Sequence, residues 1–390
     1  MKVAVVAVGQ TKFGEIWDKS LRNICTDAAK ACYNDATNQT DNFNKKNIDS
    51  LFIGNMSGGS FISQGHLGPF AADAIDLSGI SAVRCEGACA SGSLAFREAY
   101  HTILAGKSNI SMVLGAEKMT DVDPSKVLNI LMEAGDAETE GIVGLTFAGL
   151  YGFMAHRHMH EFGTTREQLA AISVINHKNG LNNPFAQFRN EISIQDVLKA
   201  SMIADPLGTL DCSPISDGAA AVILMNEECV EKYHIMNPVW IDASGCGTDR
   251  ITFHNRDKFT ELNATKIALE QIKNQGIVMK DIDILEVHDC FTINELVALE
   301  DLGFCKKGEG GSFIEKGNIN LDGKIPTNTT GGLKSIGHPV GATGVRQIVD
   351  ITKQIRGDSI NQLKKCDTGL ALNVGGIGST VVIHVLGRKV

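Results

Sequence analysis

Two kinds of apolar pattern alternate along the chain. The first is a short run of consecutive apolar residues, such as residues 3–8 and 219–224. The second is an amphipathic stretch with helical spacing, such as Leu94, Phe96 and Ile103. Continuous apolar runs of this length are typical of strands that are buried on both faces. Their alternation with helices predicts an α/β protein in which parallel sheets are covered by helices on both faces.

The same order of segments occurs twice, which indicates an internal duplication. The matched pairs are residues 3–9 with 239–245, 48–51 with 282–285, 89–92 with 341–344, and 218–224 with 378–384. We therefore expect two α/β halves of like topology that pack against each other.

The spacing of these repeats locates an insertion in the first half. Cys89 and Gly218 are 129 positions apart, whereas their counterparts Gly341 and Gly378 are 37 positions apart. About 92 additional residues are too many for an ordinary connection and predict a subdomain. The expected division is a first half of residues 1–117 and 208–230, an insertion of residues 118–207, and a second half of residues 231–390.

The insertion contains two stretches with helical spacing, near residues 144–161 and 166–179. Thr165 is a typical N-cap residue and predicts the start of the second helix, and Gly180 is a typical residue at a helix end. His156 and His160 share one face of the first helix, with His158 between them, and could bind a metal ion. No third ligand is evident, so we expect these histidines to have a structural or interface role.

Cys89 is the candidate nucleophile. It stands among small residues in the run GACASGS (residues 87–93), directly before a helical pattern. The N–H groups and the dipole at a helix start favour negative charge, so we expect this position to lower the pKa of the thiol. Cys85, four residues earlier, is a rival nucleophile, but it precedes the Gly87 turn and we expect it to be structural.

Two further motifs supply histidines and a second thiol. His338 lies in the glycine-rich run GGLKSIGHPVGATG (residues 331–344), before another helix. His288 and Cys290 lie in the run EVHDCF (residues 286–291), at the end of an expected strand. Imidazole exchanges its proton near neutral pH, so His338 is a candidate base for the thiol of Cys89. His288 and Cys290 are candidates for a hydrogen-bond donor and a proton-transfer group.

Together these motifs resemble those of the thiolase family over essentially the whole chain. The resemblance implies the thiolase fold, with two βαβαβαββ halves in α-β-α-β-α layers and an insertion that covers the active site and helps to hold coenzyme A. It also implies that Cys89 is the catalytic nucleophile and His338 the catalytic histidine.

The sequence departs from the common thiolase pattern at two places. Asn373, in the run NVGGIG (residues 373–378), stands where most thiolases have the cysteine of a Cys-x-Gly loop. The run HDCF (residues 288–291) stands where most have Asn-Glu-Ala-Phe. This pair of changes is similar to the archaeal and sterol-carrier-protein-2-like branch, which implies that Cys290 takes over the acid/base role. Gly375 is retained, and its backbone N–H is expected to bind the oxyanion together with that of Cys89.

The resemblance implies an acetyl-CoA C-acetyltransferase that condenses two acetyl-CoA molecules reversibly to acetoacetyl-CoA and coenzyme A through an acetyl-Cys89 intermediate. Three alternatives stay open. They are a 3-ketoacyl-CoA thiolase for longer chains, a decarboxylating enzyme of the β-ketoacyl synthase type, and a non-catalytic thiolase-like scaffold or lipid-binding protein. We expect coenzyme A and acetyl-CoA as substrates, no prosthetic group, no bound metal, and a homodimer or homotetramer that serves the mevalonate pathway or carbon assimilation.

Charge and composition narrow the possible partners. A net charge of −9 argues against nucleic acid and anionic membranes. The apolar runs are too short for a bilayer span or a signal peptide, so we expect a cytoplasmic protein. The ten cysteines are scattered without a Cys-x-x-Cys pair, which argues against a zinc site or a disulfide framework.

Coenzyme A is itself an anion, and the insertion contains no basic cluster. Residues 118–207 include seven Lys or Arg and eleven Asp or Glu. Members of the archaeal branch assemble with a hydroxymethylglutaryl-CoA synthase and with a small OB-fold, zinc-ribbon protein that helps to bind coenzyme A. The resemblance therefore implies these two proteins as possible partners.

Overall fold

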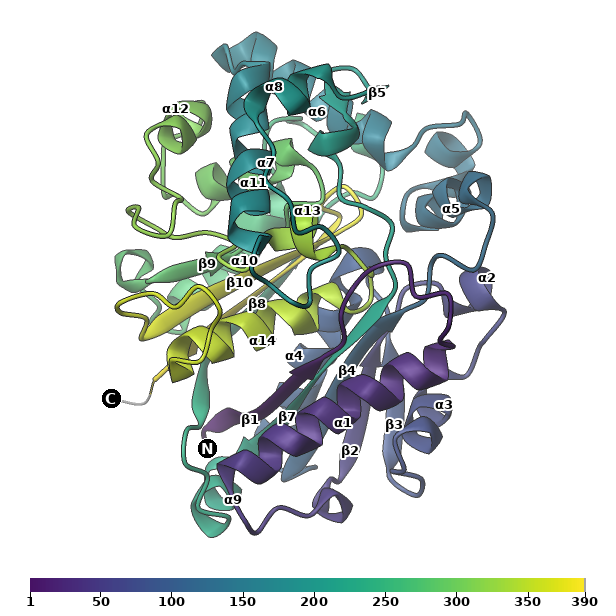
Figure 1. Cartoon of the computed structure of the whole chain (residues 1–390), viewed down its shortest axis with the longest axis vertical. Helices are drawn as coiled ribbons and strands as arrows, with labels where there is room; N and C mark the ends of the chain where they lie inside the picture. The colour runs from purple at the N-terminus through teal and green to yellow at the C-terminus, as the bar shows by residue number, and fades with distance from the viewer. Residues whose placement is uncertain (389–390) are drawn as a thin grey trace.

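The computed structural model describes residues 1–388 and contains two α/β halves with a largely helical insertion (Figure 1). The first half contains β1 (Val3–Gln10), α1 (Leu21–Gln39), β2 (Ser50–Gly54), α2 (Gly58–Ile62), α3 (Leu67–Ala74), β3 (Ser81–Cys85), α4 (Ser91–Leu104), β4 (Ile110–Glu117) and β7 (Gly218–Asn226). After the connecting helix α9 (Glu227–Lys232), the second half contains β8 (Val239–Thr248), α10 (Asn263–Asn274), β9 (Ile284–Glu286), α11 (Thr292–Asp301), α12 (Gly310–Glu315), α13 (Gly332–Ile336), α14 (Thr343–Arg356), β10 (Thr368–Gly375) and β11 (Thr380–Gly387). None of the helices in the described range combines the length and the apolar character needed to cross a membrane.

The main strands form one continuous hydrogen-bonded order of nine strands, β3-β2-β4-β7-β1-β8-β11-β10-β9. We call its two parts the first sheet, β3-β2-β4-β7-β1, and the second sheet, β8-β11-β10-β9. The two halves meet between β1 and β8, where only Ala4 with Trp240 and Val5 with Val239 are paired. On either side of this junction the same sequence of strands recurs, since β1, β7, β4 and β2 correspond to β8, β11, β10 and β9. The duplication predicted from the sequence is therefore confirmed.

The prediction of parallel sheets is wrong in part, because both sheets are mixed. β2 is parallel to β3 and β4, and β10 is parallel to β9. The pairs β4–β7, β7–β1, β10–β11 and β11–β8 are antiparallel. An uninterrupted apolar run indicates that both faces of a strand are buried, but it does not determine whether the neighbouring strand is parallel or antiparallel.

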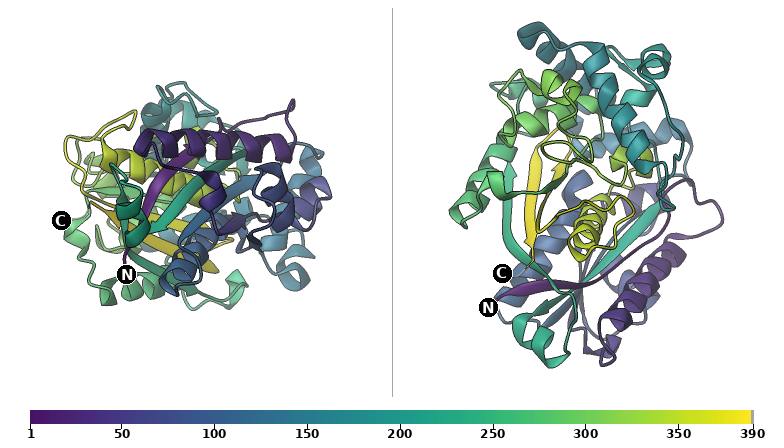
Figure 2. Two further views of the ribbon diagram at one scale, coloured as in Figure 1. Left: turned by 90° about the horizontal axis from the view of Figure 1, so that it is seen from below. Right: turned by 60° about the vertical axis from the view of Figure 1, so that its left-hand side comes forward.

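Helices and sheets form five layers (Figures 1 and 2). Helices α1 and α3 pack on the outer face of the first sheet, and α10 and α11 pack on the outer face of the second. Helices α4 and α14 lie between the two sheets, in an apolar cluster of their own. The right-hand view of Figure 2 shows α14 nearly end-on between the strands of the two halves. The expected α-β-α-β-α arrangement is therefore confirmed.

The two central helices begin side by side because glycines let their first turns touch. A Cβ atom added to Gly92 would lie 2.7 Å from the carbonyl oxygen of Gly341. A Cβ atom added to Gly344 would lie 2.4 Å from the backbone nitrogen of Ser93. The first turn of α4 and the first turn of α14, which are matched in the internal repeat, therefore meet at one point in the molecule.

The second half has only a trace of a counterpart to β3 within the described residues. A single parallel bridge joins Leu285 of β9 to Thr327. The chain then forms the short helix α13, which leads directly into the loop that contains His338. The irregular backbone at this place allows the loop that contains His338 to approach the ends of the central helices.

The insertion contains α5 (Pro124–Leu131), α6 (Phe147–Phe162), α7 (Arg166–Gly180), α8 (Ile194–Lys199) and the ribbon β5 (Met202–Ala204) and β6 (Leu207–Gly208). Thr165 caps α7 as predicted, because its side chain accepts the N–H of Gln168. Gly180 does not end α7 in a left-handed turn; its small size lets α7 approach α13, since an added Cβ would lie 1.9 Å from Ser335 Oγ. The boundaries at residues 118 and 207 stay a prediction.

Candidate active site

Cys89 lies directly before α4, as predicted, in a tight turn. A short 3₁₀ helix, Ala88–Ala90, precedes α4. Ala88 has a φ of 54°, a left-handed conformation that is unfavourable for a residue with a side chain. The Ser91 hydroxyl holds this turn, since it donates to the Ala88 carbonyl at 2.6 Å and accepts the Gly87 N–H at 3.0 Å. The turn directs the Cys89 side chain into a cavity.

The prediction that the helix start lowers the pKa of Cys89 is wrong for the resting protein. Burial disfavours the thiolate and raises the pKa to about 12, although hydrogen bonds from the backbone N–H groups of Gly376 and Cys89 act in the opposite direction. The buried carboxyl group of Glu117 adds to the increase. Cys89 is therefore a thiol at neutral pH, and it needs a base when it attacks a substrate.

His338 offers a ring nitrogen with a free lone pair to the site. Its Nδ1 lies 2.7 Å from Thr343 Oγ1, and that hydroxyl donates its hydrogen to the Pro339 carbonyl at 3.0 Å. The hydroxyl can then only accept from the ring, so Nδ1 carries the proton and Nε2 is free to act as a base. Burial lowers the pKa of His338 to about 3, so the imidazole is neutral at physiological pH.

His288 has the opposite tautomer. The amide nitrogen of Asn373 lies 2.9 Å from His288 Nδ1, and because an amide NH₂ group only donates, Nδ1 accepts and Nε2 carries the proton. Burial, together with the neighbouring His338, lowers the pKa of His288 well below its ordinary value. The two rings stand 81° apart in orientation, with centroids separated by 4.9 Å. One ring can therefore take a proton while the other donates to an oxygen that gains negative charge.

Cys290 is a buried second thiol that lines the same cavity as Cys89. Burial and the nearby Cys89 raise the pKa of Cys290, whereas a hydrogen bond with the Tyr151 hydroxyl lowers it. The same hydroxyl donates to the Gly376 carbonyl at 3.1 Å, and the Tyr151 ring stacks on Phe291 with centroids 4.6 Å apart. Tyr151 thus fixes the wall beside Cys290, and its single hydroxyl hydrogen, which now bonds the Gly376 carbonyl, would have to turn toward the sulfur to stabilise a Cys290 thiolate.

The structure brings the predicted residues of both halves together. The sulfur of Cys89 and the ligating nitrogens of His288 and His338 all lie within 4.8 Å of one another. Gly375 lies in β10 beside the turn that contains Cys89, where an added Cβ would be 2.3 Å from the carbonyl oxygen of Gly87. Its role as an oxyanion donor stays a prediction.

Asp289 connects the loops that contain His288 and His338. Its carboxylate accepts the backbone N–H of Leu333 at 2.7 Å and that of Lys334 at 3.1 Å, in the first turn of α13. Gly332 has a φ of 55°, and an added Cβ would lie 2.5 Å from the Asp289 carboxylate. Because Asp289 belongs to the HDCF motif and α13 leads to His338, these bonds hold the two motifs at a fixed separation.

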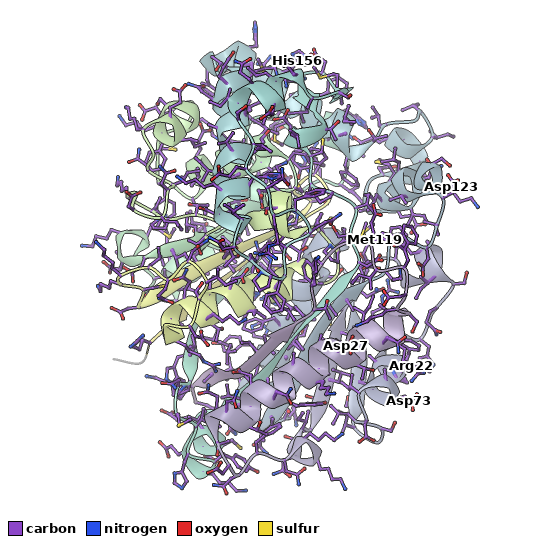
Figure 3. The ribbon with its side chains drawn as sticks, viewed as in Figure 1. Arg22, Asp27, Asp73, Met119, Asp123 and His156 are labelled. Carbon is purple, nitrogen blue, oxygen red and sulfur yellow. The ribbon has the colours of Figure 1, made fainter. Side chains whose placement is uncertain are left out.

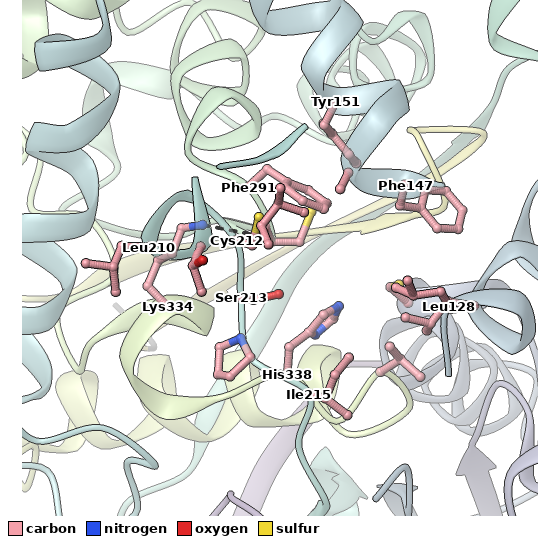
Figure 4. Close-up of a pocket in the computed structure, with 18 of the residues that line it drawn as sticks. Leu128, Phe147, Tyr151, Leu210, Cys212, Ser213, Ile215, Phe291, Lys334 and His338 are labelled. Carbon is pink, nitrogen blue, oxygen red and sulfur yellow. Dashed lines mark hydrogen bonds between the residues drawn. The ribbon is translucent and has the colours of Figure 1, made fainter. Parts of the chain in front are cut away.

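The cavity at these residues has a volume of about 380 Å³ (Figure 4). The lining residues labelled in Figure 4 come from the insertion, from the segment before β7 and from the second half. They are Leu128, Phe147, Tyr151, Leu210, Cys212, Ser213, Ile215, Phe291, Lys334 and His338. Figure 4 shows the His338 ring pointing into the middle of this space. Most of these side chains are apolar, so the cavity favours an uncharged group next to the Cys89 thiol.

Sequence comparisons identify the family that has this arrangement. Residues 3–228 match the family model of the thiolase N-terminal domain, and residues 245–388 match that of the thiolase C-terminal domain-like family. The chain belongs to the thiolase family. The resemblance noted in the sequence motifs is thereby confirmed.

Similar proteins agree with this assignment. The thiolase is 45% identical over 389 residues to acetyl-CoA acetyltransferase of Methanothermobacter thermautotrophicus, with 99% of each chain covered. It is 33% identical to sterol carrier protein 2 of Bos taurus, with 98% of this chain and 71% of that protein covered. Its fold matches the Ltp2-ChsH2(DUF35) aldolase with a TM-score of 0.84 at 23% identity, covering 100% of this chain and 99% of that one. The predicted class of enzyme, an acyltransferase, is confirmed.

The histidines of α6 lie outside the thiolase site. His156 is at the upper end of the insertion, where its Nε2 is 2.6 Å from a carboxylate oxygen of Asp205 (Figure 3). His158 is buried and contacts Thr164 Oγ1 at 2.8 Å and Glu300 at 3.0 Å. The two side chains have different partners on different segments, which fits the expected structural role.

Three residues of this thiolase site, Gly376, Lys334 and Tyr151, are not predicted from the sequence motifs. Gly376 and Lys334 lie inside two of the predicted motifs, so their position in the sequence could have indicated them. Gly376, for example, directly follows the predicted Gly375. Tyr151 lies in the insertion, outside any motif, and reaches Cys290 only because α6 folds over the second half. No local pattern in the sequence distinguishes Tyr151 from an ordinary buried aromatic residue.

Proposed function

We propose that this thiolase catalyses the reversible Claisen condensation of two acetyl-CoA molecules to acetoacetyl-CoA and coenzyme A, through an acetyl group on Cys89. The observation that carries the proposal is the placement of the Cys89 thiol beside the free nitrogen of His338, with the Cys290 thiol in the same cavity. One thiol can hold an acyl group while the other moves a proton. The similarity to the acetyl-CoA acetyltransferase of M. thermautotrophicus supports acetyl as that group.

In the first stage, the sulfur of Cys89 attacks the thioester carbon of acetyl-CoA as its proton passes to His338 Nε2. The backbone N–H groups of Cys89 and Gly376, which face the sulfur, bind the tetrahedral oxyanion, with Gly375 as a further candidate. When the intermediate collapses, the C–S bond to coenzyme A breaks. The leaving sulfur takes the proton from His338, so that a neutral thiol departs and acetyl-Cys89 remains.

In the second stage, a second acetyl-CoA enters and Cys290 passes its proton to His338. The Cys290 thiolate then removes a proton from the α-carbon of acetyl-CoA. The enolate oxygen is stabilised by the Nε2–H of His288 and by protonated His338. The enolate carbon attacks the acetyl carbon on Cys89, the Cys89 sulfur leaves and takes the proton from His338, and acetoacetyl-CoA is released.

The proposal is tested by a series of acyl-CoA chain lengths in both directions, with the full chain. We expect kcat/KM for thiolysis of acetoacetyl-CoA to exceed that for long 3-oxoacyl-CoA substrates by roughly tenfold or more, since pocket fit to a few methylenes produces such ratios. A preference for long chains would instead indicate a 3-ketoacyl-CoA thiolase. Faster condensation from malonyl-CoA with loss of CO₂ would indicate a decarboxylating synthase, and the absence of any acyl transfer would indicate a scaffold or lipid-binding protein.

The binding of coenzyme A is the part of the proposal that involves other proteins. Among the described residues that line the cavity, Lys334 is the one lysine or arginine. Burial lowers its pKa, and its side-chain nitrogen bonds the carbonyls of Asp211 and Cys290. Three apolar side chains at the opening are exposed by 38–54%: Leu128, Phe188 and Ile203. Few cations and an apolar rim support a docking site for a protein that supplies further contacts to coenzyme A.

We therefore propose that the small OB-fold, zinc-ribbon protein binds at this opening and that hydroxymethylglutaryl-CoA synthase belongs to the same assembly. We also propose that this chain forms a homodimer or homotetramer. The Ltp2-ChsH2(DUF35) aldolase, whose name joins two components, supports an assembled form. Calorimetric titration of coenzyme A is expected to give at least about tenfold tighter binding when the small protein is added, because new phosphate contacts form. Equal affinity with and without the small protein would contradict this part of the proposal.

A further inference from the structure

The three residues at the centre of the site are also a set of metal ligands. Thiolate and imidazole are the ligands that Zn²⁺ prefers in proteins. The donor atoms of Cys89, His288 and His338 lie within 4.8 Å of one another. Ligand atoms around tetrahedral zinc are roughly 3.3–3.6 Å apart, given bond lengths of about 2.0–2.3 Å. The limit of 4.8 Å exceeds the lower end of that range by about 1.5 Å, so small shifts of the side chains bring the three donor atoms to the separation that zinc requires.

The two histidines are held from behind, as metal-binding histidines usually are. His338 Nδ1–H donates to Thr343 Oγ1 at 2.7 Å, so its Nε2 faces the site with a free lone pair. In metal centres the ring nitrogen that is not bonded to the ion is fixed in this way by a polar partner. His338 therefore has the tautomer and orientation of a ligand before any ion arrives.

His288 requires one change, which its partner Asn373 can supply. Asn373 now donates to His288 Nδ1 at 2.9 Å, and the amide oxygen Asn373 Oδ1 is buried without a hydrogen-bond partner among the described atoms. If the amide group turns by half a rotation, Oδ1 accepts a proton from Nδ1 and the Nε2 lone pair of His288 is freed. The same asparagine can thus support a hydrogen-bond donor for catalysis or a metal ligand.

We propose that Cys89, His338 and His288 form a binding site for Zn²⁺, or another thiophilic divalent ion such as Cd²⁺, and that binding reversibly blocks acyl transfer. The ion replaces the Cys89 proton, which is released to the buffer, and no oxidation or reduction occurs. A fourth position of the tetrahedron faces the cavity, where water can occupy it. The inhibitory consequence rests on the proposed role of Cys89 as nucleophile, whereas binding of the metal does not.

Co²⁺ is the spectroscopic probe for this site, because Co²⁺ substitutes for Zn²⁺ and absorbs when it is bound to thiolate. Titration of the full chain with Co²⁺ is expected to produce a thiolate charge-transfer band that saturates at one equivalent. The band should disappear in Cys89→Ala and persist unchanged in the matched control Cys85→Ser. His338→Ala should weaken binding by at least about tenfold, whereas Asn373→Asp, which can only accept from Nδ1, should strengthen it by about tenfold.

Activity and chemical protection provide the second readout. Zn²⁺ is expected to inhibit acyl transfer and to protect Cys89 from iodoacetamide, and a chelator should restore both. A band that survives in Cys89→Ala, or weaker binding in Asn373→Asp, would overturn the proposal. If Co²⁺ binds as described but acetyl-CoA does not acylate the protein, the metal site stands and the proposed function fails. If acyl transfer is normal and Zn²⁺ has no effect on it, the proposed function stands and the metal site fails.

Discussion

Replacing Cys89 with serine is expected to lower acyl transfer from acetyl-CoA by a factor of roughly 10⁴ or more, the scale on which covalent nucleophiles contribute. His338 has a pKa of about 3 and is a weak base, so it can assist a thiol but not a much less acidic hydroxyl. Mass spectrometry after incubation with acetyl-CoA should show an acetyl group on the wild-type protein and none on Cys89→Ser. Substrate binding should change little, because one atom of the cavity wall is replaced.

Cys85→Ser is the matched control for the nucleophile variant. Cys85 is four residues away at the end of β3, burial raises its pKa to about 12 as it does for Cys89, and its side chain is not among those that line the cavity. Its replacement should leave acetylation of Cys89 intact. Acetylation of Cys89→Ser at the wild-type rate would show that another group accepts the acyl unit.

Replacing Cys290 with alanine is expected to separate the two stages of the reaction. Acetylation of Cys89 and exchange of labelled coenzyme A into acetyl-CoA should stay within about twofold of wild type, because neither needs a proton from carbon. Condensation to acetoacetyl-CoA, and its reverse, should fall roughly 10²–10⁴-fold, which is the usual contribution of a general base. Isotope exchange and product formation measured on the same preparation test both expectations.

An equal loss of exchange and condensation in Cys290→Ala would count against the acid/base role, because it would indicate that Cys290 supports the cavity as a whole. Cys212 supplies the control for this point. It is a third thiol on the cavity wall, and burial raises its pKa to about 11, but it belongs to neither catalytic motif. Cys212→Ser should affect both stages alike, through substrate binding, and should not separate them.

Much of the site could be predicted from the sequence because each part of it is a local motif. The residues around Cys89 must have small side chains and must begin a helix. Gly92 in particular has no room for a Cβ atom, because it contacts Gly341. The matched segment at residues 341–344 supplies the other side of the same contact. The internal repeat predicted two halves that pack together, whereas the order of layers followed from the resemblance to thiolases, and the meeting of the two motifs depends on the folded structure.

Other properties could not be predicted, because they depend on burial or on contacts between distant segments. The sequence places Cys89 at a helix start, but the raised pKa follows from the surrounding layers and the buried Glu117. Strand direction depends on connections, which apolar runs do not encode. The bond between Asn373 and His288 joins residues that are 85 positions apart, so the tautomer of His288 is a property of the folded chain alone.

The meeting of α4 and α14 has a consequence for charge. The positive ends of two helix macrodipoles point into one small volume, so an oxyanion or a thiolate is stabilised there, and a cation is stable there only when a thiolate or another anion compensates for its charge. His338 can therefore keep a proton only briefly, while an anionic neighbour compensates for it. The two repeated halves therefore share a single region of positive potential, to which each half contributes one helix.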